Sequence, residues 1–335
     1  MRQIFIKENE AGQRLDKYLH KYLKEAPGSF IHKMLRKKNI ILNGKKSSGS
    51  EKLAIGDEIR LFLSEETMDK MAGSDDGSSD IFSGHRADAY KEAYGKYKEL
   101  EIIYENHHIL IVNKPAGILT QKAEPEDLSL NEWFIGYMLT HGKITEEELR
   151  TFKPSVCNRL DRNTSGMVIC GKTLSGSQKM SELLKNRDLH KYYRLYVKGK
   201  VKSASLIEGY LIKDMQKNTV KISTKQEHDN SSYIKTRYEP LKTAEDKTLL
   251  EVELITGKTH QIRAHLASIG HPLLGDYKYG DKNFNDRYKK KFGIRSQLLH
   301  AYRLEFPELA GEFEDMSRKV FIAKLPQIFR QLEVE

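Results

Sequence analysis

A polar segment interrupts this chain between residues 64 and 97 and divides it into two parts of unequal size. The segment, SEETMDKMAGSDDGSSDIFSGHRADAYKEAYGKY, is rich in glycine, serine and acidic residues and has almost no aliphatic periodicity. Such a composition is typical of a linker. The chain of 335 residues also exceeds the length that one hydrophobic core usually serves. We therefore predict two domains, at 1–63 and 98–335, joined by a linker at 64–97 whose order the sequence leaves open.

The first domain shows a pattern of short helices and strands. In QRLDKYLHKYL, residues Leu15, Tyr18 and Leu19 recur at spacings of three and four, which predicts a helix with one apolar face. A second helix is predicted to begin with Ser29 as its N-cap. A short strand at 40–42, a turn and a further strand in AIGDEIRLFL follow. The sequence thus predicts a small N-terminal α/β module.

The second predicted helix ends in three adjacent cations, Arg36, Lys37 and Lys38. The whole chain contains 57 lysines and arginines against 47 acidic residues, a net charge of +10. This balance is expected of a protein that meets a polyanion, so we predict that these three residues contact RNA. A basic helix that simply faces water would have the same sequence.

Strand-like and helix-like segments are mixed from residue 98 onward. The strand-like stretches are ELEIIYE, HILIVNKPAG, MVICGK, YYRLYVKG, LLEVELIT and LLHAYRLEF, and the helix-like stretches are LNEWFIGYMLTHG, SGSQKMSELLKN and KTHQIRAHLASIG. Several neighbouring strands have no helix between them, which favours antiparallel pairing over a doubly wound sheet. We therefore predict an α+β fold, in which this domain has a central mixed, largely antiparallel sheet flanked by helices.

Signatures of nucleotide, metal and membrane sites are missing from the sequence. ITGKTH resembles the end of a phosphate-binding loop, but Val252 stands where that loop needs glycine. His260 and His265 are five residues apart with no carboxylate between them, which is a poor spacing for a metal. No apolar run approaches the ~18 residues of a membrane span. We expect no cofactor, no metal and no membrane, and the two cysteines without CxxC spacing favour the cytoplasm.

One acid stands between two arginines in NRLDRNTSG, residues 158–166. Asp161 lies just before the turn that leads into the strand MVIC, so its side chain can project from the end of a sheet. About a hundred residues later, GKTHQIRAH places Arg263 in a helix-like run. A carboxylate that acts as nucleophile or base in a water-poor pocket needs a permanent cation beside it, which Arg263 would supply. The alternative is a structural ion pair that joins two loops.

These motifs, in this order, resemble two known families. The first domain resembles the S-four RNA-binding domain through QRLDKYL, SFIHKMLRKKNIILNGKK and IGDEIRLFL. Residues 98–335 resemble the RluA-like pseudouridine synthases through ILIVNKPAGILTQ, NRLDRNTSG, KYYRLYV, GKTHQIRAH and LLHAYRLEF. An S-four domain ahead of such a catalytic domain is common in that family. The resemblance implies the pseudouridine synthase fold and an enzyme that isomerises uridine in RNA without a cofactor.

The resemblance also implies a role for each motif residue. Asp161 is the expected catalytic aspartate, Arg263 pairs with it, and Tyr193 stacks on the target uracil. Arg159 would enter the RNA stack where the uridine has left. Tyr192 would face the other side of the same strand, so a core or surface role for either tyrosine stays open. Whether the aspartate attacks the sugar, attacks the ring or removes a proton also stays open.

Four more motif residues are expected to contact the substrate RNA: Asn158, Lys258, His260 and Gln261. The family usually has histidine in place of Asn158 and arginine in place of Lys258. Asparagine still forms hydrogen bonds and lysine still meets a phosphate, although without the bidentate fork of arginine. These two departures therefore concern which RNA and which uridine are bound.

The expected substrate is large-subunit ribosomal RNA, with transfer RNA as the alternative, and the chain is expected to act as a monomer. Two other functions would also suit a basic chain with an RNA-binding module. One is an RNA-binding or ribosome-assembly factor without catalytic activity, which would have no need of Asp161. The other is an RNA methyltransferase, although the sequence lacks a GxGxxG loop after a strand.

Overall fold

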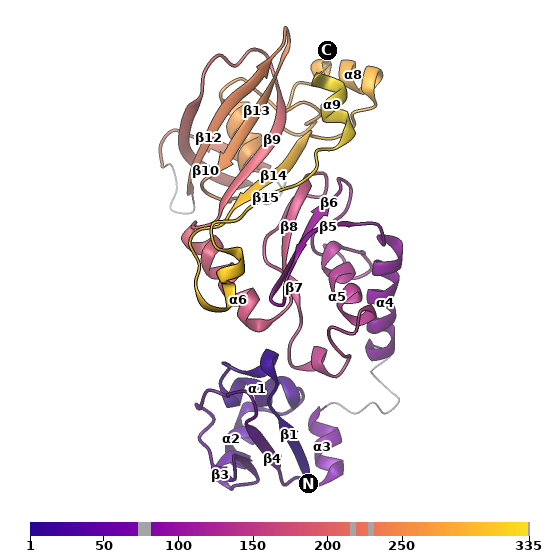
Figure 1. Ribbon diagram of the computed structural model, residues 1–335, viewed down its shortest axis with the longest axis vertical. Coiled ribbons are helices and arrows are strands. Elements are labelled where there is room, and N and C mark those ends of the chain that lie inside the picture. The colour runs from indigo at the N-terminus through magenta and orange to yellow at the C-terminus, as the bar shows by residue number, and fades with distance from the viewer. Residues whose placement is uncertain (73–81, 215–218, 227–230, 334–335) are drawn as a thin grey trace.

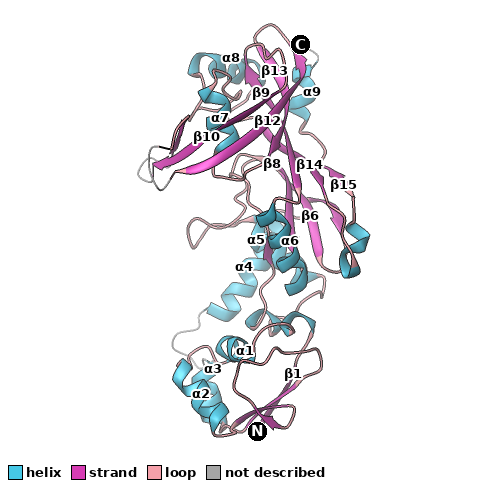
Figure 2. Ribbon diagram, turned by 90° about the vertical axis from the view of Figure 1, so that its left-hand side faces the viewer, coloured by secondary structure: helices cyan, strands magenta, loops and turns pink. Residues whose placement is uncertain are grey.

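The computed structural model describes residues 1–72, 82–214, 219–226 and 231–333. Figures 1 and 2 show a small unit at one end of an elongated molecule and a larger unit built around a long twisted sheet. We call residues 1–72 the N-terminal unit and residues 82–333 the larger unit. The two lie next to each other through the 3₁₀ turn η1 (Glu8–Glu10) and the helix α6 (Leu174–Asn186).

The N-terminal unit packs two helices on a four-stranded antiparallel sheet of order β1-β4-β2-β3. Its elements are β1 (Arg2–Phe5), the 3₁₀ turn η1 (Glu8–Glu10), α1 (Leu15–Tyr22), α2 (Gly28–Arg36), β2 (Ile40–Leu42), β3 (Lys45–Lys46), β4 (Glu58–Leu61) and α3 (Glu65–Ala72). The predicted apolar face of the first helix is confirmed, because Leu15, Tyr18 and Leu19 are buried.

The predicted N-cap of the second helix is wrong. Helix α2 begins at Gly28, one residue before Ser29, and Pro27 occupies the N-cap position. The Pro27 carbonyl accepts the backbone N–H groups of Phe30 and Ile31, at 2.9 and 3.3 Å, and so closes the first turn without any side-chain cap. Proline suits this place because its φ is fixed and it has no N–H to leave unpaired.

Both ends of the expected linker are helical. Helix α3 belongs to the N-terminal unit and buries Met68, whereas α4 (Phe82–Lys96) packs against α5 (Leu130–Thr140) of the larger unit. Helix α4 buries a residue at every third position: Ala87, Tyr90 and Ala93. This helical period is hard to recognise in the sequence because the surrounding residues are polar. The glycine- and serine-rich stretch at 73–81 lies outside the described residues. We therefore group α4 with the larger unit, and the domain bounds remain a prediction.

The larger unit contains a mixed sheet in which β8 and β14 are parallel and the other described pairs are antiparallel. Its main path runs β11-β10-β12-β13-β9-β14-β8-β6-β5, with β15 beside β14 and β7 beside β8. The strands are β5 (Glu101–Glu105), β6 (Ile109–Lys114), β7 (Ser155–Val156), β8 (Ser165–Gly171), β9 (His190–Lys198), β10 (Ser205–Asp214), β11 (Thr219–Ser223), β12 (Ser232–Thr243), β13 (Lys247–Leu254), β14 (Leu299–Glu305) and β15 (Val320–Ile322). The predicted α+β fold is thus confirmed.

Helices and short turns flank this sheet. Besides α4 and α5 they are η2 (Glu148–Arg150), α6 (Leu174–Asn186), α7 (Gln261–Ser268), α8 (Lys282–Phe292), η3 (Gly311–Met316) and α9 (Gln327–Glu333). Helix α5 is apolar on nearly all sides, with Trp133, Phe134 and Tyr137 buried, because it is enclosed by the sheet core and by α4. Among the described residues, no helix is both long and apolar enough to cross a membrane.

The parallel pairing of β8 with β14 fixes the loop that precedes β8. Gly166 has φ of 111°, and a Cβ there would lie 2.3 Å from the Ala301 carbonyl oxygen, so only glycine lets the two strands approach. One residue earlier, the Ser165 hydroxyl lies 2.8 Å from Nδ1 of His300 in β14. The end of the NRLDRNTSG loop is therefore attached to the centre of the sheet.

Replacement of Gly136 by alanine is expected to force α4 away from α5. A Cβ on Gly136 would lie 2.0 Å from the Tyr90 carbonyl oxygen, and overpacking of this kind typically costs about 1 to 3 kcal/mol. A lower melting temperature and faster protease cleavage around α4 would show the effect. Gly95→Ala in α4 is the matched control, because a Cβ there meets nothing within 4 Å and alanine favours the helix by about 1 kcal/mol. Equal stability of the Gly136→Ala variant and the parent would contradict this helix packing.

Candidate active site

A cavity of about 980 Å³ is formed by the loop at 157–164, the start of α7 and part of β9. Eight of the residues predicted from the sequence line it: Asn158, Arg159, Asp161, Tyr193, Lys258, His260, Gln261 and Arg263. The other three, Arg36, Lys37 and Lys38, lie at the end of α2 in the N-terminal unit, and Figure 1 shows that unit at the far end of the molecule from β12 and β13. The structure therefore brings the two sequence motifs together and leaves the N-terminal cations apart.

The cavity is strongly positive. Its described lining residues include eight cationic side chains: Arg159, Arg162, Arg187, Lys191, Lys213, Lys258, Arg263 and Lys278. Asp161 is the single carboxylate among those lining residues. The cations affect one another: the pKa of Lys191 is lowered by burial and by the nearby positive charge of Arg187. Such a cleft attracts a polyanion and presents one acid to it.

Asp161 forms a hydrogen bond with Arg263, and a second acid, Asp276, holds Arg263 in position. Oδ2 of Asp161 accepts a hydrogen bond from Nη1 of Arg263 at 3.0 Å. The remaining edge of that guanidinium donates from Nε and Nη2 to the two oxygens of Asp276, at 2.7 and 2.9 Å. The side chain of Asp161 is 29% exposed and that of Asp276 is 0% exposed. Asp161 can therefore meet a substrate, whereas Asp276 can only orient Arg263.

The electrostatics of the buried pair keep both groups charged. Burial by itself raises the pKa of Asp276, but the Arg263 guanidinium and two backbone N–H groups outweigh it and leave that pKa below its usual value. Those N–H groups come from Lys278 and Tyr279, at 2.9 and 3.1 Å. Burial lowers the pKa of Arg263, yet Asp276 and Asp161 more than offset this and raise it. A bidentate pair with its lone pairs satisfied meets the conditions under which a buried ion pair is stable.

His260 lies beside the same carboxylate. It occupies the N-cap position of α7 with φ of 56°, in the left-handed region. Its Nδ1 is 2.9 Å from the Tyr279 hydroxyl, and its Nε2 is 3.8 Å from Oδ2 of Asp161. Burial lowers the pKa of His260, although the charge of Asp161 opposes this, and the net effect favours the neutral imidazole. The Tyr279 ring also faces the Arg263 guanidinium, 5.2 Å away.

The two neighbouring tyrosines of β9 point to different places. Tyr193 lines the cavity and is only 6% exposed. Burial, and then the charge of Asp161, raise the pKa of Tyr193, so its phenol stays protonated beside the carboxylate. Tyr192 lies on the opposite side of the strand, where the Arg303 guanidinium stacks on its ring at 3.7 Å. Of the two, Tyr193 is therefore the aromatic residue available to a base in the cavity.

Asn158 lines the cavity, and its side-chain amide also forms hydrogen bonds within the protein. Its Oδ1 accepts the backbone N–H of Ile169 at 2.7 Å, and its Nδ2 donates to the Met167 carbonyl at 3.3 Å. Both partners belong to β8, so Asn158 attaches the loop to that strand. Arg159, the next residue, is exposed at the cavity.

The side-chain amide of Gln261 is likewise engaged within the protein. Its Nε2 donates to the Thr236 hydroxyl at 3.0 Å, and its Oε1 accepts from the Thr256 hydroxyl at 2.9 Å and from the backbone N–H of Lys258 at 3.1 Å. The residue is 2% exposed. It therefore shapes the start of α7, while the side chain of Lys258 is exposed at the cavity rim.

Sequence reasoning missed two charged residues that support the site, Asp276 and Lys114. Lys114 ends β6 and is fully buried, and its Nζ donates to the carbonyls of Pro115, Ile118 and Arg162 at 3.1, 2.8 and 3.1 Å. Burial lowers the pKa of Lys114 to about 7, and the nearby Asp161 opposes that shift. The available signal in each case was a charged residue one position beyond the end of an apolar run, in ILIVNK and in PLLGD.

Nearly the whole chain is similar to known proteins. It is 30% identical over 317 residues to "Ribosomal large subunit pseudouridine synthase C" of Vibrio vulnificus, covering 92% of this chain and 89% of that protein. It is 31% identical over 317 residues to the protein of the same name from Vibrio cholerae, with 92% and 90% covered.

A solved structure agrees with the fold. "Human RNA Pseudouridylate Synthase Domain Containing 4" superposes with a TM-score of 0.56 at 22% identity, covering 74% of this chain and 95% of that one. The family described as RNA pseudouridylate synthase matches residues 108–268, a range that contains both Asp161 and Arg263. With relatives of this identity and coverage, the chain belongs to the RNA pseudouridylate synthase family.

Proposed function

We propose that this chain converts uridine to pseudouridine in large-subunit ribosomal RNA. The observation that carries the proposal is the single carboxylate, Asp161, which Arg263 and Asp276 hold in place within a cavity otherwise lined by cations. Membership of the family and the names of the relatives support the same reaction and the same class of RNA. An RNA-binding factor without activity would have no use for this buried arrangement.

The reaction is an isomerisation. The bond from ribose C1′ to uracil N1 breaks, a bond from the same C1′ to C5 forms, C5 loses its proton to solvent, and N1 gains a proton. No group is imported and nothing is oxidised, so the proposal needs no cofactor. We also propose that the chain acts as a monomer.

Asp161 is the proposed catalytic residue. The hydrogen bond from Arg263 favours the ionised form of the Asp161 carboxylate and fixes the position of its Oδ2. Because the side chain is partly exposed, Oδ1 can reach a bound nucleotide. Three routes are open to this carboxylate: attack on C1′, attack on the uracil ring, or removal of a sugar proton to give a glycal. In each route the arginine holds the acid in a reactive position.

The cavity is suited to a nucleotide turned out of an RNA helix. Flipping a base costs a few kcal/mol, and stacking on an aromatic ring returns about 1 to 3 kcal/mol per base. Tyr193 is the proposed platform for the uracil, and the exposed Arg159 is proposed to fill the gap left in the RNA stack. The remaining cations of the rim, Lys258 among them, would contact phosphates.

The N-terminal unit is proposed to add affinity without selecting a sequence. Arg36, Lys37 and Lys38 are exposed together at the end of α2, away from the cavity. Cations in such a cluster displace counterions from any RNA backbone, so their effect depends on salt and little on sequence. The proposed division of work is therefore affinity from the N-terminal unit, which resembles an S-four domain, and selectivity from the cleft.

Asp161→Asn is expected to abolish tritium release from RNA that carries 5-tritiated uridine, while RNA affinity stays within about twofold, because the carboxylate serves the chemistry and not the binding. The exposed acid Asp188 gives the matched control, and Asp188→Asn should release tritium at the parent rate. Tritium release by the Asp161→Asn variant would overturn the assignment. RNA binding without release by the parent chain would instead favour the inactive binding factor.

Asp276→Asn is expected to lower kcat by about 100-fold with little change in KM, because a misplaced Arg263 no longer aims Asp161. Asp276→Glu keeps the charge and should restore part of the activity. Single-turnover kinetics with saturating RNA measure both variants, and their melting curves exclude unfolding as the cause. An unchanged kcat in the folded Asp276→Asn variant would show that this acid does not position the arginine.

Replacement of Arg36, Lys37 and Lys38 together by glutamine is expected to weaken binding to RNAs of different sequence by similar factors. The slope of log affinity against log salt should fall by about one per phosphate contact removed, so by up to about three. Filter binding over a salt series measures the slope, and kcat at saturating RNA should be preserved. A salt slope equal to that of the parent chain would exclude these residues from the RNA interface.

A further inference from the structure

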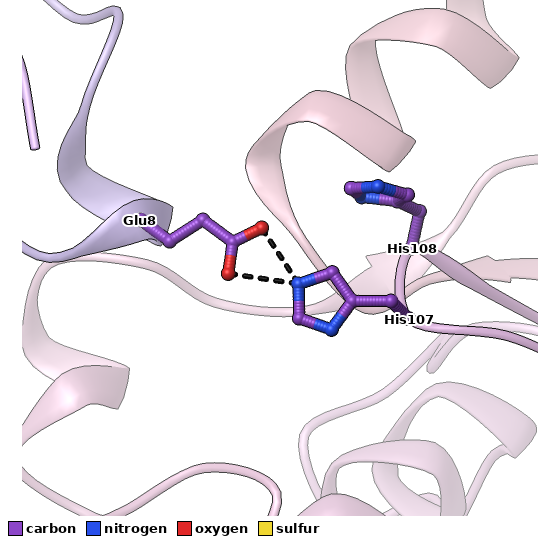
Figure 3. Close-up of side chains that lie close together, drawn as sticks. All are labelled: Glu8, His107 and His108. Atoms are coloured by element: carbon purple, nitrogen blue, oxygen red, sulfur yellow. Dashed lines mark hydrogen bonds and ion pairs between the residues drawn. The ribbon is translucent and has the colours of Figure 1, made fainter. Parts of the chain in front are cut away.

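Three side chains with metal-binding atoms meet where the N-terminal unit faces the larger unit. They are Glu8 of η1 and His107 and His108, which lie in the turn between β5 and β6. Their nearest ligand atoms all lie within 4.8 Å of one another. Figure 3 shows the Glu8 carboxylate pointing at the His107 ring, and both of its oxygens lie 2.7 to 2.8 Å from Nε2.

The turn that carries the two histidines is fixed by its own hydrogen bonds. Oδ1 of Asn106 accepts the backbone N–H groups of His108 and Ile109, at 2.9 and 2.8 Å. Nδ1 of His108 lies 3.0 Å from the Thr173 hydroxyl, so Nε2 is the nitrogen left for a ligand. A hydrogen bond to the other ring nitrogen is the usual second contact of a metal-binding histidine. A second carboxylate is also near, because Oε2 of Glu312 lies 3.7 Å from Nε2 of His108.

Glu8 is held at this place by contacts on the residues that follow it. Oδ1 of Asn9 accepts the backbone N–H of Leu174 at 3.3 Å. The carboxylate of Glu10 accepts from the Thr151 hydroxyl at 2.7 Å and is buried. These contacts bring a carboxylate of one unit to a pair of imidazoles of the other, without requiring a metal to do so.

We propose that Glu8, His107 and His108 form a binding site for a divalent ion of the zinc class, which joins the N-terminal unit to the larger unit. Two imidazole nitrogens and one carboxylate oxygen are a donor set that Zn²⁺ takes, with the fourth position left to water or to Glu312. None of the three residues lines the cavity around Asp161. The ion would therefore serve the arrangement of the two units and not the chemistry.

A simple ion pair between Glu8 and a protonated His107 is the competing explanation for the same contact. The two explanations differ in their dependence on pH. Metal binding requires a neutral imidazole, so it weakens as the solution becomes acidic. An ion pair requires the imidazolium, so it strengthens in acid.

The test is a calorimetric titration of the chelator-treated, full-length chain with zinc chloride at pH 7.5 and at pH 6. The site predicts one ion per chain, weaker binding at pH 6, and affinity reduced by at least about tenfold in Glu8→Gln and in His107→Asn, since each variant loses one ligand. With cobalt(II) in place of zinc, the parent chain should show the visible absorption bands of a four-coordinate ion. Both variants should lose these bands.

Two matched substitutions in the N-terminal unit control for general surface binding. Glu25→Gln and His32→Asn each change an exposed residue of the same type outside the cluster, and both should keep the parent affinity. No zinc binding by the parent chain, or equal affinity in the parent and in the two cluster variants, would overturn the site. The readout is independent of pseudouridine formation, so the result stands apart from the proposed activity.

Discussion

The site depends on the way one guanidinium is divided between two acids. Arg263 gives Nε and Nη2 to the buried Asp276 and Nη1 to Asp161, so its orientation is set before any substrate arrives. Asp276 is fully buried and neutralises the guanidinium on the side away from the cavity. Asp161 is partly exposed and faces the cavity. A lone arginine on an exposed loop would lack this orientation.

The sheet supplies the frame that makes this contact possible. Asp161 and Arg263 are 102 residues apart, and the loop of Asp161 is attached to β8, whose parallel pairing with β14 requires glycine at position 166. Strand β9 lies on the other side of β14 and carries Tyr193 to the same cavity. The eight cations of the lining then set a positive field in which a single carboxylate is exposed, an arrangement suited to RNA chemistry.

Much of the fold was predictable because local patterns dominate it. The helix at Leu15–Tyr22 and the central strands follow from the period of their apolar residues, and the mixed sheet follows from strands that lack intervening helices. Helix α4 was harder to see, since its buried face consists of two alanines and a tyrosine within a polar stretch. Asn158 and Gln261 were predicted from the sequence to contact RNA, and only the structure shows that their amides also bond to neighbouring protein groups.

The sequence by itself determined the family, the α+β class and the motif residues Asp161, Tyr193 and Arg263, because motif order and apolar period are properties of the chain alone. Only the tertiary structure decided which groups meet across long separations. Three examples are the contacts of Asp276 with Arg263, of Lys114 with the loop that carries Asp161, and of Glu8 with His107. Each role follows from a distance between groups that are separated in the sequence. Such distances depend on how separate elements pack, and no local pattern in the sequence encodes them.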